Sequence, residues 1–131
     1  MVENKGKWKK LSSKVVHESP YYFVREDDVI KPDGSKGKYN VVVTKGAVFI
    51  VAIDNEKNVY LERLYRYTND NYSVEIPAGG TEGEEPLIAA KRELQEETGL
   101  EANTWKALGI MYPANGLLSE ENHVYLATDL K

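Results

Sequence analysis

The spacing of apolar and polar residues along this chain predicts mostly β-structure with a single helix. Apolar residues alternate with polar ones, or form short runs, between clusters of Gly, Pro, Asn and Asp, which is typical of short strands. Strands are expected at residues 21–30, 38–44, 47–54, 59–65, 73–76, 105–112 and 123–130. Irregular loops are expected at residues 77–85 and 113–122, which are rich in glycine and polar residues.

Two of these strand predictions carry more detail. Residues 21–30 and 38–44 are expected to form a hairpin, because Pro32, Asp33 and Gly34 between them favour a turn. Residues 47–54 are nearly all apolar, so this strand is expected to be covered on both faces.

The helix is predicted between residues 86 and 98. Pro86 suits the first helical position and Gly99 the position just past the end. Leu87, Ala90 and Leu94 form an apolar stripe that would seat this helix on a sheet. Strands, one helix and further strands give too few crossovers for a parallel doubly wound sheet, so an α+β fold with mixed sheets is expected.

Composition and charge exclude several classes of protein. The chain has 131 residues, of which 41% are hydrophobic and 29% charged, as in an ordinary globular domain. Its net charge of −4 disfavours nucleic-acid binding, and the absence of cysteine excludes disulfides and thiol chemistry. The polar N-terminus lacks a signal-peptide pattern and no apolar run could span a bilayer, so a soluble cytoplasmic protein without a membrane partner is expected.

The predicted helix carries an acidic stripe. At about 100° per residue, Glu93, Glu96 and Glu97 share one side of the helix, and Arg92 can pair with Glu96 one turn later. The stripe could be a solvated helix face, because glutamate is a good helix former. The glycine-rich loop before the helix, which also carries Glu84, favours a divalent cation site instead, since Mg²⁺ binds carboxylates together with substrate phosphates.

The segment "GGTEGEEPLIAAKRELQEETGL" resembles the Nudix box, the loop–helix–loop signature of the Nudix hydrolases. Every fixed position of that pattern from Glu84 to Leu100 is matched. Only four residues separate Gly79 from Glu84, where the family has five. Either the loop is one residue shorter, or Gly79 is not the equivalent glycine. The resemblance implies a Nudix fold with a loop–helix–loop catalytic motif.

The flanking segments are similar to the ADP-ribose pyrophosphatase branch of this family. The similar stretches are "LYRYTNDNYSVEIPAGG" and "YPANGLLSEENHVYLATDL". That branch usually continues into a C-terminal helix, so either a truncated chain or a shorter relative lacking this helix is expected. Residues 1–45 are expected to be an N-terminal hairpin region that forms a homodimer, and residues 46–131 the catalytic domain. The alternative is a hairpin folded back on its own domain.

The resemblance implies hydrolysis of the pyrophosphate bond of ADP-ribose, or of a related nucleoside diphosphate sugar, to AMP and ribose 5-phosphate. The expected cofactor is Mg²⁺, with Mn²⁺ as the alternative. Two other functions stay open: hydrolysis of another nucleoside diphosphate derivative, and binding of ADP-ribose without cleavage.

The resemblance also implies roles for individual residues. Glu93, Glu97 and Glu96 would bind the metal with the Ala78 carbonyl, and Arg92 would hold the glutamates in place. Glu84 would support the loop or the metal, or would simply be a carboxylate favoured by the helix N-terminus.

Substrate contacts are expected from residues outside the helix. Arg66 would clamp a phosphate or the ribose, unless it is simply an exposed strand arginine. Glu75 would bind the sugar or base, and Gly79 would approach the substrate. Tyr21 and Tyr22 are candidates for stacking on adenine.

The general base is expected either on the helix, at Glu96, or on the later loop, at Glu120. Gly116 would let that loop close over the substrate. The alternative is that the "SEEN" segment is only a solvated loop tip.

Overall fold

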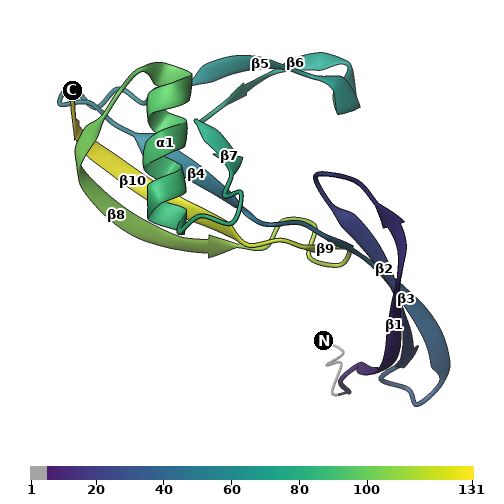
Figure 1. The fold of residues 1–131 in the computed structure, drawn as a ribbon. Coiled ribbons are helices and arrows are strands. Elements are labelled where there is room, and N and C mark those ends of the chain that lie inside the picture. The colour runs from purple at the N-terminus through teal and green to yellow at the C-terminus, as the bar shows by residue number, and fades with distance from the viewer. Residues whose placement is uncertain (1–5) are drawn as a thin grey trace. The chain divides into compact units, whose positions relative to one another are not determined.

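A computed structural model describes residues 6–131, so the first five residues of the predicted N-terminal region lie outside it. The chain forms two compact units (Figure 1). The first contains residues 6–44 and 114–120, and the second contains residues 45–113 and 121–131.

The first unit is a four-stranded sheet in the order β1-β2-β3-β9. Its strands are β1 (Lys9–Glu18), β2 (Phe23–Ile30), β3 (Lys36–Val43) and β9 (Leu118–Ser119). The hairpin predicted around the turn at residues 31–35 is confirmed, because β2 and β3 pair antiparallel across it. Strand β9 runs parallel to β3, so residues 113–122 are not wholly irregular as predicted.

Strand β1 was not predicted, and the start of β2 was placed too early. Every residue of β1 is exposed, so its sequence lacks the alternation that burial imposes. Tyr21 and Tyr22 lie in a turn, because the Ser19 hydroxyl accepts hydrogen bonds of 3.2 Å from both of their amides. Strand β2 therefore begins at Phe23.

The second unit contains a mixed sheet in the order β7-β4-β10-β8 and a separate β5-β6 hairpin. The strands are β4 (Ala47–Ala52), β5 (Glu62–Arg66), β6 (Asn71–Glu75), β7 (Ala78–Gly80), β8 (Ala102–Met111) and β10 (Asn122–Leu130), and the 3₁₀ turn η1 (Tyr67–Asn69) joins β5 to β6. β4 and β10 are parallel, whereas β8 and β7 run antiparallel to their neighbours. The predicted α+β architecture with mixed sheets is confirmed. The prediction that residues 77–85 are wholly irregular was wrong, because β7 pairs with the edge of β4.

The helix α1 (Pro86–Thr98) begins and ends as predicted. Gly99 adopts φ 73°, the left-handed conformation that favours glycine, and its amide donates to the Gln95 carbonyl at 2.9 Å. The N-cap is Glu85, whose carboxylate accepts 3.2 Å hydrogen bonds from two amides of the first turn. The carboxylate of the preceding residue, Glu84, accepts a 2.8 Å hydrogen bond from Nε of Arg92.

The core lies between α1 and one face of the β4-β10-β8 sheet, across which the helix runs in Figure 1. Ala90 and Leu94 of the predicted apolar stripe are fully buried, and Leu87 packs at the margin. Strand β4 alternates: Val48, Ile50 and Ala52 are buried, while the residues between them are only half-buried. The prediction that this strand is covered on both faces was wrong, because α1 covers one face. In the part of the chain that the structure describes, no helix has the length and apolar character needed to cross a membrane.

Candidate active site

The site is built where helix α1 approaches the edge strand β7. A Cβ placed on Gly79 would overlap the carboxylate of Glu93, so only glycine permits this approach. Glu93 is correspondingly buried, and burial raises the pKa of its carboxyl above the ordinary value. The structure thus brings Gly79 and Glu93 together.

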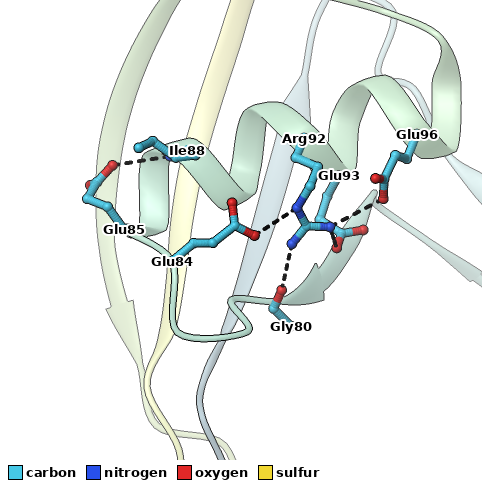
Figure 2. A network of polar contacts seen from close by, with 7 residues as sticks. All are labelled: Gly80, Glu84, Glu85, Ile88, Arg92, Glu93 and Glu96. Atoms are coloured by element: carbon cyan, nitrogen blue, oxygen red, sulfur yellow. Dashed lines mark hydrogen bonds and ion pairs between the residues drawn. The ribbon is translucent and has the colours of Figure 1, made fainter.

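Arg92 connects the loop, the helix and strand β7. Its guanidinium donates to Glu84 at 2.8 Å, to Glu93 at 2.7 Å and to Glu96 at 3.2 Å, as Figure 2 shows. A fourth hydrogen bond of 3.2 Å goes to the Gly80 carbonyl. The bond to Glu93, and then that to Glu84, raise the pKa of Arg92 above its ordinary value. The predicted pairing of Arg92 with Glu96 is one part of this network.

Glu97 contacts strand β7 at its first residue, Ala78. Its Oε2 accepts a 3.0 Å hydrogen bond from the Ala78 amide. Burial raises the pKa of Glu97 to about 6; the Ala78 amide opposes this shift, and the neighbouring Glu62 carboxyl increases it. The sequence reasoning did not identify Glu62.

The β5-β6 hairpin carries Arg66, the predicted substrate-binding arginine, whose charge acts on the carboxylate of Glu97. Arg66 donates from Nε and Nη2 to Oε2 of Glu75, at 2.9 and 2.8 Å. Glu75 lies opposite Glu62 in the hairpin register, and the charge of Arg66 acts on Glu97. The strand register places residues 62 and 75 opposite each other. The position of the turn between β5 and β6 sets this register, so the turn is the sequence signal that could have predicted the pair.

Four of the predicted site residues belong to the first unit. Tyr21 is 84% exposed, and the Tyr22 ring lies 5.7 Å from the ring of His17. Glu120 accepts a 3.2 Å hydrogen bond from the Thr44 hydroxyl. The Gly116 carbonyl accepts one of 2.6 Å from the hydroxyl of Tyr39. Residues 114–120 are therefore attached to the first sheet at several points and are not a free loop tip.

A divalent cation fits the donor chemistry of the second unit. Between residues 6 and 131, no three His, Asp or Glu side chains converge as a ready set of metal ligands. Arg92 donates hydrogen bonds to Glu93 and Glu96, and the Ala78 amide donates to Glu97. However, Oε1 of Glu62 is buried without a hydrogen-bond partner, and the pKa of Glu97 is raised. Carboxylate oxygens of this kind are the donors that hard divalent cations prefer.

The pKa of Glu97 predicts a pH dependence of stability in the metal-free protein. The folded protein keeps this proton up to about pH 6, whereas the ordinary value is 4.5. The free energy of unfolding should therefore fall as the pH rises from 4.5 to 6, by about 1 kcal/mol after solvent screening. Glu97→Gln should flatten this slope and leave stability at neutral pH unchanged or higher. Thermal melts in EDTA across this range measure it, and an unchanged slope in the variant would contradict the assignment.

Comparison with known proteins identifies two family models along the chain. Residues 43–130 match the NUDIX domain, and residues 8–42 match the nucleoside diphosphate sugar hydrolase N-terminal domain.

Individual proteins of known name resemble most of this chain. It is 40% identical to the ADP-ribose pyrophosphatase of Mycobacterium tuberculosis, over 92% of this chain and 59% of that protein. It is also 40% identical to the methanol dehydrogenase activator of Bacillus methanolicus, over 79% of this chain and 57% of that protein. A crystal structure of an ADP compounds hydrolase superposes with a TM-score of 0.84 at 27% identity, covering 95% of this chain and 69% of the other. The chain thus spans less than two thirds of the length of both named relatives.

Proposed function

Because this chain belongs to the Nudix family, we propose that it hydrolyses the pyrophosphate bond of ADP-ribose or a related nucleoside diphosphate sugar. ADP-ribose would yield AMP and ribose 5-phosphate. One observation carries the proposal: Glu93 and Glu97 meet strand β7 beside the Arg66–Glu75 pair. The resemblance to a mycobacterial ADP-ribose pyrophosphatase supports the substrate class. A cytoplasmic location remains a prediction, based on the absence of cysteine.

The proposed cofactor is Mg²⁺, with Mn²⁺ as the alternative. Glu93, Glu96 and Glu97 would hold it with the Ala78 carbonyl. When bound, a divalent cation neutralises phosphate charge and orients a water molecule.

Other side chains of the second unit would hold the proposed metal ligands in place or bind the substrate. Arg92 keeps Glu93 and Glu96 in place through its fixed fork of N–H donors. Arg66 would exchange part of its bond to Glu75 for a phosphate or ribose oxygen, and Glu75 would then accept from the sugar or base.

A panel of substrates tests the proposal directly. Purified protein with Mg²⁺ is incubated with ADP-ribose, GDP-mannose, NADH and nucleoside triphosphates, and the products are separated by chromatography. We expect AMP and ribose 5-phosphate from ADP-ribose at the highest kcat/KM. Faster cleavage of another compound would favour the alternative of a different nucleoside diphosphate derivative. Binding of ADP-ribose without cleavage would identify a sensor.

The general base is proposed to be Glu120, in preference to Glu96. Glu120→Gln should slow single-turnover hydrolysis by about 10²-fold with little change in metal affinity, because it removes a proton acceptor. Glu121→Gln is the matched control and should have almost no effect. The base would instead be on α1 if Glu96→Gln removed the rise of the single-turnover rate with pH. In that case Glu120→Gln would lower the rate only slightly.

We also propose that residues 1–45 mediate a homodimer with twofold symmetry. The observation in favour is the exposure of apolar side chains on β1, such as Leu11, Val15 and Val16, each about half exposed. Light scattering at micromolar concentration should give twice the monomer mass. Val15→Lys should shift the protein towards the monomer, and Lys14→Ala on the same strand is the control. A monomer mass for the unmodified chain would refute the dimer.

A further inference from the structure

An asparagine–glycine pair lies in an exposed turn of the first unit. Asn115 and Gly116 occupy the two central positions of this turn, and both residues are exposed. The amides of Leu117 and Leu118 close the turn by donating to the Ala114 carbonyl, at 2.8 and 2.9 Å. The turn therefore presents the asparagine side chain and the glycine amide to solvent.

The reactive groups of this pair are not engaged by the rest of the protein. Within residues 6–131, neither the Asn115 side chain nor the Gly116 amide has a hydrogen-bond partner. Gly116 also carries no side chain that would shield its amide nitrogen. A bond from this nitrogen to Cγ of Asn115 closes a five-membered ring, and such a reaction is favoured because the two groups are already tethered at short range.

We propose that Asn115 is a site of spontaneous modification, at which its carboxamide becomes a carboxylate through a cyclic imide. The Gly116 amide nitrogen loses its proton and bonds to Cγ of Asn115. The bond from Cγ to Nδ2 breaks, and ammonia leaves with that proton. Water then opens the ring at either carbonyl and leaves aspartate or β-linked isoaspartate at position 115. The reaction uses only the chain and water, so this inference does not rest on the proposed function.

The turn between β2 and β3 offers the first comparison, because it contains an aspartate–glycine pair whose groups are engaged. The Gly34 amide donates to the Lys31 carbonyl at 2.9 Å. Oδ1 of Asp33 accepts from the amide and the hydroxyl of Ser35, at 2.9 and 2.6 Å. These bonds from Ser35 lower the pKa of the Asp33 carboxyl, and an ionised carboxylate is a poor electrophile. Asp33 should therefore react much more slowly than Asn115.

Asn55 offers the second comparison, because it is exposed but precedes a residue that has a side chain. The amide of that next residue, Glu56, donates to Oδ1 of Asp54 at 2.8 Å. The nitrogen that would attack Asn55 is therefore both crowded and held by a hydrogen bond. Asn55 should stay intact while Asn115 is converted.

The modification would change how residues 114–120 are attached to the first sheet. The Gly116 carbonyl accepts a 2.6 Å hydrogen bond from the hydroxyl of Tyr39, and Leu118 pairs with Val42 shortly after. The β-linked product adds a carbon to the backbone inside this turn. The added carbon shifts the carbonyl relative to Tyr39 and should loosen this attachment.

Peptide mapping of the intact chain tests the site. The folded protein is incubated at physiological temperature and mildly alkaline pH, and samples taken over several weeks are digested. Mass spectrometry locates the converted residue, and chromatography separates the aspartate and isoaspartate products. We expect Asn115 to react within about tenfold of its rate in a free peptide of residues 112–118, and Asn55 and Asp33 to react at least about tenfold more slowly than Asn115.

Two variants test the mechanism of the reaction. Asn115→Gln keeps the amide but has to close a larger ring. Gly116→Ala should keep the turn, because Gly116 has no positive φ and a Cβ there would meet nothing within 4 Å, yet the methyl group crowds the attacking nitrogen. We expect each variant to slow conversion at position 115 by at least about tenfold. Circular dichroism checks that both variants are folded.

Three results would overturn the proposal. The first is an intact Asn115 after the free peptide has been converted completely. The second is conversion of Asn55 or Asp33 as fast as that of Asn115, because the contacts of the turn would then make no difference. The third is an unchanged rate in a folded Gly116→Ala variant, because attack by that amide nitrogen would then not be the step that limits the reaction.

Discussion

Glu97→Gln is expected to lower the turnover of ADP-ribose by about 10³-fold at saturating Mg²⁺, because it removes the charge of a proposed metal ligand. The fold should persist, since the glutamine carbonyl can still accept the 3.0 Å hydrogen bond from the Ala78 amide. Steady-state kinetics with circular dichroism of the same samples measure both effects.

The matched control for this variant is Glu101→Gln, which makes the same change of charge at an exposed position just beyond α1. Its kcat should equal that of the unmodified chain. Near-normal turnover in Glu97→Gln would exclude Glu97 as a ligand, whatever the family resemblance suggests.

Arg92→Ala is expected to have the second-largest effect, because three carboxylates lose their common partner. Glu84, Glu93 and Glu96 would repel one another, and Glu93 is largely buried. We expect the free energy of unfolding to fall by about 2–3 kcal/mol. The kcat should also fall, since Glu93 and Glu96 would lose their orientation.

Two further variants make the Arg92 prediction specific. Arg92→Lys keeps the charge but cannot reach Glu84, Glu93 and the Gly80 carbonyl together, so chemical denaturation should give an intermediate loss. Lys91→Ala removes the adjacent, exposed cation and should be silent. Equal losses in Lys91→Ala and Arg92→Ala would mean that net charge, and not the network, is responsible.

The helix and its contacts could be predicted because their signals are local. Pro86 and Gly99 mark its ends, and the spacing of Ala90 and Leu94 marks the face that packs on the sheet. The side of the helix that carries Glu93 and Glu97 follows from the same geometry. The position of Glu93 and Glu97 on α1 could therefore be predicted from the sequence.

Features that depend on pairing between distant segments could not be predicted in this way. Strand β1 is exposed throughout, and β7 has only three residues, so neither shows a periodic pattern. Glu62 reaches Glu97 only through the folded position of the β5-β6 hairpin. The contact between Gly79 and Glu93 likewise depends on how β7 lies under the helix.

The pairing of β3 with β9 has a consequence for synthesis of the chain. Tyr39 donates to the Gly116 carbonyl across 77 residues, and β9 covers one edge of β3. During translation, β1, β2 and β3 leave the ribosome well before that covering strand exists. The nascent sheet therefore presents an unpaired strand edge, which invites association with other chains. Fragments that end before residue 114 should consequently aggregate more readily than the 131-residue chain.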